Sequence, residues 1–219
     1  MRKHSQFAPG IVWLGATLLC TMTPSIELTS AAVHEAGHVV VAYALGRRVT
    51  LIRLGEQTVP TNHPHTELLK GSVTGGESRF GPALATEIYE NVNAGIPLTA
   101  GQIEWLRAEL VTCFAGALAE TRLRGEQNTG SALADLKQGS IVVGLLGINA
   151  DADGGEARVE RAGGIAERII IELEACVEQV ATALSQGPCE LDEPAAHSLL
   201  DRSGVGQGTH RALLEDLAT

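Results

Sequence analysis

Residues 31–46, A-A-V-H-E-A-G-H-V-V-V-A-Y-A-L-G, decide the fold that the sequence predicts. Apolar residues recur in this stretch at helical spacing, and the glycine at its end is a stop signal. A helix is therefore expected over residues 28–45, with Thr29 or Ser30 as its N-cap. The other elements are predicted outward from this helix.

The same stretch contains H-E-A-G-H, in which His34 and His38 are four residues apart. This spacing places both imidazoles on one side of a helix, about one turn apart, so both can bind one cation. Glu35 lies beside them, where its carboxylate can take a proton from a zinc-bound water without binding the metal. The alternative is a chance pair of histidines on an apolar helix face. The helical context and Gly37, which permits close packing, favour zinc.

The rest of the chain is predicted to be mainly helical, with a small amount of strand. Residues 48–54 alternate and are rich in β-branched side chains, so a strand is expected there, with a partner over residues 67–74. Helices are predicted over residues 82–91, 98–124, 132–146, 156–185 (jointed at Gly163 and Gly164) and 193–200. The fold class is therefore mainly α (α+β), with a small β-hairpin or sheet after the first helix.

Three parts of the chain are expected: an apolar segment 1–25, a domain over residues 26–202 and a flexible tail over residues 203–219. The first segment has two basic residues before an apolar run, as targeting sequences do, but the run is short for a membrane span. We therefore expect a cytoplasmic protein, with membrane association through segment 1–25 as the alternative.

Composition narrows the classes of function. The formal net charge is −10, from 26 acidic residues against 16 lysines and arginines, whereas a nucleic-acid-binding protein needs a basic face. No nucleic-acid partner is therefore expected.

The four cysteines form no C-x-x-C pair, so neither a zinc ribbon nor a disulfide framework is implied. Any metal must be held by histidine and carboxylate.

Two carboxylates compete for the place of third ligand. Asp135 is expected in the first turn of a helix, and a carboxylate completes a His-His-carboxylate site. Its alternative role is that of an ordinary acid near a helix start, interacting with the helix dipole. Glu120 is the rival, because it lies on a helix expected to pack beside the histidine helix. The remaining candidate histidines are expected at the surface: His63, His65, His197 and His210.

Residues 31–46 resemble the peptidase domain of FtsH-type zinc proteases, the membrane AAA proteases of bacteria and organelles. Residues 114–125, F-A-G-A-L-A-E-T-R-L-R-G, are similar to the A-G-R-x-A-E-E helix of that family. Residues 129–136, T-G-S-A-L-A-D-L, are similar to its T-G-A-x-x-D-L segment, and residues 174–192 resemble its closing helix and L-D signature. The resemblance concerns the peptidase part alone, since the sequence contains no G-x-x-x-x-G-K-[ST] loop.

The resemblance implies a helical zincin-like peptidase domain that binds Zn2+ and hydrolyses unfolded polypeptides or peptides. It implies Asp135 as the third zinc ligand, although four residues separate it from Gly130 where the family has three. It also implies that Glu120 orients a histidine ligand and that Glu35 is the general base and later proton donor. An extended substrate would lie along the edge of the strand at residues 48–54, which could instead be purely structural.

A non-catalytic zinc-binding regulatory or interaction module that retains the peptidase fold is the alternative function. The retained Glu35 argues against this alternative, because loss of catalysis would remove the need for that residue. A homo-oligomer and a separate ATPase partner are both left open by the sequence.

Overall fold

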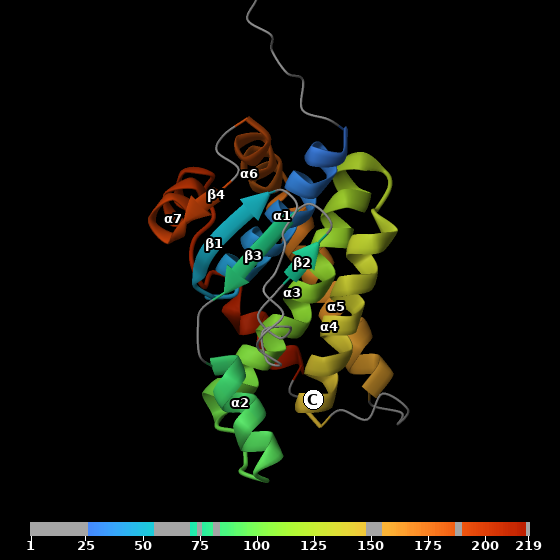
Figure 1. Cartoon of the computed structure of the whole chain (residues 1–219), viewed down its shortest axis with the longest axis vertical. Helices are drawn as coiled ribbons and strands as arrows, with labels where there is room; N and C mark the ends of the chain where they lie inside the picture. The colour runs from blue at the N-terminus through green and yellow to red at the C-terminus, as the bar shows by residue number, and fades with distance from the viewer. Residues whose placement is uncertain are drawn as a thin grey trace, which may run out of the picture.

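Seven α-helices, one 3-10 helix and a four-stranded antiparallel sheet make up the described part of the chain (Figure 1). The structure is a computed structural model, and it describes residues 26–54, 71–73, 76–80, 84–147, 155–186 and 190–217. The mainly helical class with a small sheet is thereby confirmed. The apolar segment 1–25 and the histidines at 63 and 65 lie outside the described residues. Among the helices that can be described, none is both long and apolar enough to cross a membrane.

Helix α1 (Ile26–Ala44) is the central element of the fold. It packs against α3, α5 and α6 and against strand β1, so it is apolar on nearly every side, as a fully enclosed helix must be. The predicted N-cap is wrong: α1 begins at Ile26, and Ser30 lies inside it, where its hydroxyl donates a hydrogen bond to Glu120. The stop after α1 is confirmed, because Gly46 has a φ of +89°, which glycine adopts without strain.

Helix α3 (Ala100–Arg124) lies directly beside α1. Thr99 and Gln102 form a capping box at its start, and Gly125, with a φ of +77°, ends it as predicted. The two helices approach closely because the contact is made of small residues. A Cβ added at Gly37 would lie 2.6 Å from both the carbonyl oxygen of Ala115 and the Cβ of Ala119. This close approach brings the backbone of α3 up to the histidines of α1.

The sheet has the strand order β2-β3-β1-β4, with all neighbours antiparallel. Its strands are β1 (Val49–Leu54), β2 (Gly71–Val73), β3 (Gly76–Phe80) and β4 (Glu190–Asp192). The first two lie within predicted strands, whereas β3 and β4 were not predicted. The sequence of β3, G-E-S-R-F, has a single apolar residue, and β4 has only three residues, so neither carries a strand pattern. Both form because β1 offers them a partner on each side.

The other α-helices are α2 (Leu84–Asn93), α4 (Thr129–Leu145), α5 (Gly155–Glu172), α6 (Glu174–Gln186) and α7 (Glu193–Arg202). Helix α4 begins three residues before its predicted start, because the Asn128 side chain accepts hydrogen bonds from the N–H groups of Gly130 and Ser131. The joint predicted at Gly163 and Gly164 is wrong. Both glycines lie inside α5, and the chain breaks at Leu173 instead, so packing of α5 outweighs their low helix propensity.

Residues 203–217 pack on the domain, in contrast to the flexible tail expected from the sequence. The N–H groups of Gly208 and His210 donate hydrogen bonds to the carbonyls of Tyr43 and Ala44, at the C-terminal end of α1. The segment thus supplies a partner to the Ala44 carbonyl and a second one to the Tyr43 carbonyl, which also accepts a hydrogen bond from the N–H of Gly46. The 3-10 helix η2 (Arg211–Leu217) follows, with Leu214 and Leu217 buried.

Candidate metal centre

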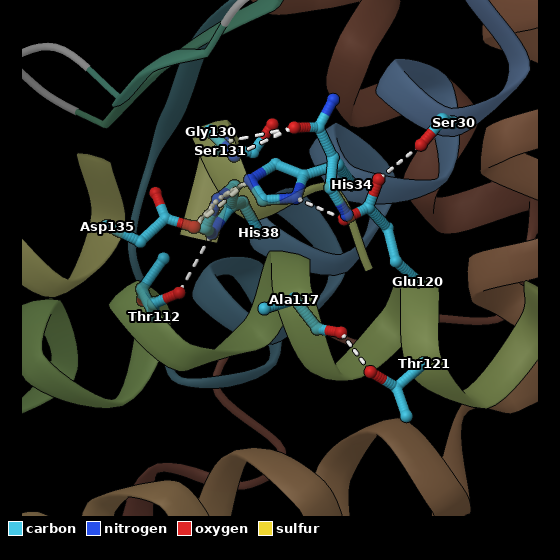
Figure 2. Close-up of polar contacts among 11 residues, drawn as sticks. Ser30, His34, His38, Thr112, Ala117, Glu120, Thr121, Gly130, Ser131 and Asp135 are labelled. Atoms are coloured by element: carbon cyan, nitrogen blue, oxygen red, sulfur yellow. Dashed lines mark hydrogen bonds and ion pairs between the residues drawn. The ribbon is translucent and has the colours of Figure 1, made fainter. Parts of the chain in front are cut away.

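His34 and His38 project from α1 toward one point between α1, α3 and α4 (Figure 2). Their rings are edge to face with centroids 4.7 Å apart, and their Nε2 atoms are 3.0 Å apart. Both side chains are buried, at 0% and 4% exposure. The helical spacing therefore brings the two imidazoles together as predicted.

Asp135 approaches the same point from α4. Its Oδ2 atom lies 3.0 Å from Nε2 of His34 and 3.3 Å from Nε2 of His38. Ligand atoms around one tetrahedral zinc ion are about 3.3 Å apart, because each lies about 2.0–2.2 Å from the metal. The three donor atoms thus have the separations that one zinc ion requires. In the described part of the chain they form the group of side chains suited to hold a metal.

The position of Asp135 within its helix differs from the prediction. It was expected in the first turn, but α4 begins at Thr129, so Asp135 lies in the second turn. An acid at that depth gains little from the N-terminal dipole, because the dipole effect is confined to the first turn. Asp135 is also buried, at 5% exposure, and its contacts are with the two imidazoles. The alternative role as an ordinary helix-start acid is therefore disfavoured.

Glu120 lies on the far side of His34 from Asp135, as Figure 2 shows. Its Oε2 atom is 3.3 Å from Nδ1 of His34 and accepts a 2.9 Å hydrogen bond from the N–H of Asn128, while Ser30 donates to Oε1. The carboxylate thus contacts the ring nitrogen that faces away from Asp135. In this position Glu120 fixes the ring orientation of His34 rather than joining the ligand group.

The tautomer of His38 is set by the backbone of α3. Its Nδ1 atom is 2.8 Å from the carbonyl oxygen of Thr112, and a carbonyl can only accept, so Nδ1 carries the proton. The lone pair of the neutral ring is then on Nε2, which faces Asp135 and His34. Both histidines therefore have a partner for Nδ1 and direct Nε2 toward the same point, as metal-binding histidines do.

Gly116 of α3 lies against both Nε2 atoms. A Cβ added at this position would be 2.5 Å from Nε2 of His34 and 2.6 Å from Nε2 of His38, closer than side chains can approach. Any larger residue would therefore displace the two imidazoles. Gly116 was not predicted to be a residue of the site. The small-residue run F-A-G-A-L-A in α3 was its only signal, and that run cannot show which glycine faces the histidines.

A buried polar network behind Thr112 was also missed. Arg47 forms an ion pair with Glu109, donates a 3.4 Å hydrogen bond to Oγ1 of Thr112 and lies 4.7 Å from the ring centroid of Trp105. Gln138 of α4 donates to Glu109 over 3.3 Å. The network connects the segment after α1 with α3 and α4, so it links the two ligand-bearing helices, α1 and α4, through α3. No motif indicates it, because its members come from three distant segments.

The charges of the centre shift the pKa values of its members in opposite directions. Burial lowers the pKa of His34, but hydrogen bonds to Asp135 and Glu120 and the charges of Asp135 and Glu35 outweigh it and raise the pKa to about 10. Burial raises the pKa of Asp135, but the two histidines outweigh it and lower the pKa to about 2. The carboxylate is therefore ionised at neutral pH, as a metal ligand must be.

Glu35 is fully buried next to this group. Its charge contributes to the raised pKa values of both His34 and His38, which places the carboxylate within electrostatic reach of both rings. Of the three ligand candidates, only His38 and Asp135 have any exposure, at 4% and 5%, and the Oδ2 atom of Asp135 is buried.

Two other histidines and one strand were also candidates for functional roles. His197 and His210 are half-buried: His197 packs edge to face on Tyr43, and His210 contacts Glu172 at 3.0 Å. The strand at residues 48–54 cannot offer a substrate edge, because β1 pairs with β3 on one side and β4 on the other. Within the described sheet the edge strand that packs against α4, the helix of Asp135, is β2.

No family model matches the sequence, and no curated protein is found to be similar to it. The resemblance to FtsH-type peptidases therefore rests on the four short sequence segments alone.

Proposed function

We propose that this protein is a zinc-dependent peptidase that hydrolyses unfolded polypeptides or peptides. The observation that carries the proposal is the approach of Asp135 to within 3.0 and 3.3 Å of the Nε2 atoms of His34 and His38. Asp135 lies on α4, whereas both histidines lie on α1. The histidine pair alone could have arisen by chance. Convergence with a buried carboxylate is what a His-His-carboxylate zinc site requires.

The residues fit zinc in donor type as well as in spacing. Two neutral imidazoles and one carboxylate are donors that zinc prefers, and three protein ligands leave a coordination position open, as catalytic sites need. The contact of Glu120 with His34 and that of the Thr112 carbonyl with His38 supply the supporting hydrogen bonds of such sites. Gly116 keeps clear the space against both Nε2 atoms.

In the proposed mechanism Glu35 performs the proton transfers. Its carboxylate takes a proton from the attacking water and later gives it to the amine of the leaving peptide. Glu120 and Thr112 hold the two imidazoles in position throughout. A bound zinc ion would supply Lewis-acid chemistry by lowering the pKa of water and polarising the peptide carbonyl.

The edge of β2 is the proposed binding place for an extended substrate. Among the described strands β2 pairs with β3 alone, and β2 packs against α4, the helix that carries Asp135. A peptide added to that edge would form main-chain hydrogen bonds that do not depend on its sequence. Binding of this kind suits a peptidase with unfolded chains as substrates.

One observation favours a second candidate function, a non-catalytic zinc-binding module. The three ligands are at most 5% exposed and Glu35 is fully buried, and such enclosure is also typical of structural metal sites. The two functions predict the same metal content and differ only in catalysis.

The experiment that tests the proposal combines metal analysis with peptide cleavage. Purified protein should contain about one zinc per chain. It should cleave an unstructured peptide, lose cleavage on chelation and regain it with added zinc. The double variant His34→Ala, His38→Ala should contain no zinc. Zinc without cleavage would support the module, and zinc retained by the double variant would contradict the site.

A further inference from the structure

A cavity of about 410 Å3 lies apart from the metal centre, between α3, the C-terminal end of α4, the start of α5 and η2. Its walls are mostly leucine and isoleucine side chains, among them Leu110 of α3, Leu145 of α4 and Leu217 of η2. The volume is within the range of small-molecule sites, which are mainly apolar with a few polar groups that orient the ligand.

Arg107 of α3 and Arg158 of α5 supply the charged groups of this cavity. Among the described residues, neither guanidinium forms an ion pair, and Nε of Arg158 is buried without a hydrogen-bond partner. Glu104, one turn before Arg107 on α3, is within electrostatic reach of Arg107, but its carboxylate is held by Arg211, with a 2.7 Å hydrogen bond between Nη2 and Oε2. Two positive charges thus remain at an apolar cavity in a chain of net charge −10.

We propose that this cavity binds a medium-chain alkyl carboxylate, such as a free fatty acid of about ten carbons, with the carboxylate at Arg107 and Arg158. The length follows from the volume: one water molecule takes up about 30 Å3 in the liquid and a methylene group is of similar size, so about 410 Å3 holds about a dozen non-hydrogen atoms. Decanoate fits this limit.

The composition of the walls selects an alkyl chain over a peptide. A peptide C-terminus would also bring a carboxylate to the two arginines. However, it would place main-chain N–H and C=O groups against leucine and isoleucine walls, where they would find few partners. An alkyl chain has no such groups, and its burial is favourable along its whole length. The site does not depend on the proposed peptidase activity.

The test is calorimetric titration of the full chain with decanoate, with decan-1-ol as the uncharged probe and an acetylated tri-leucine peptide as the peptide probe. Decanoate should bind with a saturable 1:1 isotherm, and decan-1-ol should bind at least about 10-fold more weakly, because it lacks the charge-assisted hydrogen bonds. Arg158→Gln and Arg107→Gln should each weaken decanoate binding by about 10-fold and leave decan-1-ol binding unchanged.

Arg168→Gln is the matched control, because it removes the same charge from an exposed position of α5 that is already paired with Glu172. It should leave decanoate affinity unchanged, and all three variants should keep the zinc content of the wild type. Absence of saturable binding, equal affinity for decanoate and decan-1-ol, or an equal loss in Arg168→Gln would overturn the proposal. Tighter binding of the peptide than of decanoate would overturn it in favour of a peptide terminus.

Discussion

Oδ2 of Asp135 lies 3.0 Å from Nε2 of His34, although α2, α3 and three strands of the chain separate the two residues in sequence. The contact depends on the close packing of α1 on α3, which Gly37 permits, and on the packing of α4 on α3. Helix α3 therefore acts as the platform on which the two ligand-bearing helices meet. Its residues should control metal binding without being ligands.

Gly116→Ala should abolish stoichiometric zinc binding. The new Cβ would lie within 2.6 Å of both Nε2 atoms, so the imidazoles would have to move apart. Gly101→Ala, in the first turn of the same helix with nothing within 4 Å, is the control. It should keep full zinc and gain about 0.5–1 kcal/mol of stability from helix propensity. The measurement is zinc content by atomic absorption, with thermal unfolding; full zinc in Gly116→Ala would contradict the geometry.

Asp135→Ala should weaken zinc retention far more than Glu120→Gln. The first change removes a ligand atom, whereas the second weakens a 3.3 Å contact to Nδ1 of His34 and should cost about 10- to 100-fold in affinity. Zinc competition with a chelator measures both. The reverse order would make Glu120 the ligand.

Glu109→Gln should destabilise the fold by about 3–5 kcal/mol, because it leaves the buried Arg47 without its opposite charge. Glu193→Gln breaks a similar pair with Arg48 at the surface and should change stability little, since solvent screens exposed pairs. Urea unfolding gives the free energy of unfolding of both variants, and so compares the loss of a buried ion pair with the loss of an exposed one. Equal losses would show that the network behind Thr112 is not a buried charge pair.

Zinc affinity should rise with pH between about 6 and 9, by at least about tenfold per unit, because the pKa values of both His34 and His38 are raised. The pKa of His34 is raised to about 10 by its contacts with Asp135 and Glu120, so below that pH zinc must displace a proton from the imidazole. Asp135, with its pKa lowered to about 2, is already ionised and adds nothing over this range. The zinc affinity at each pH can be measured by competition with a chelator whose own pH dependence is known. A flat profile would mean that His34 is neutral before zinc binds.

Structural features that depend on residues close together in the sequence could be predicted from local patterns. The H-E-A-G-H spacing predicted the histidine pair, and glycines with positive φ marked the ends of α1 and α3. Asp135 and Glu120 could be named as candidates, but their separate roles depend on how α3 and α4 pack on α1, which periodicity does not contain. The 3.0 Å contact of Asp135 and the position of Glu120 at Nδ1 of His34 distinguish them.

Features that depend on distant partners could not be predicted. Strands β3 and β4 form because β1 pairs with both, although their own sequences carry no strand pattern. The C-terminal segment is ordered because its N–H groups meet the carbonyls of Tyr43 and Ala44. Arg47 and Glu109 likewise find each other only in the folded chain.

We propose Glu35 as a base for peptide hydrolysis rather than as a structural residue of a zinc-binding helix. Glu35→Gln is nearly isosteric and removes the base while leaving the three ligands in place. The direct measurement is cleavage of an unstructured peptide by wild type and Glu35→Gln at equal zinc content. We expect the variant to fold and bind zinc like the wild type, yet cleave at least about 100-fold more slowly. Equal cleavage by the two proteins, or none by either, would contradict the catalytic role of Glu35.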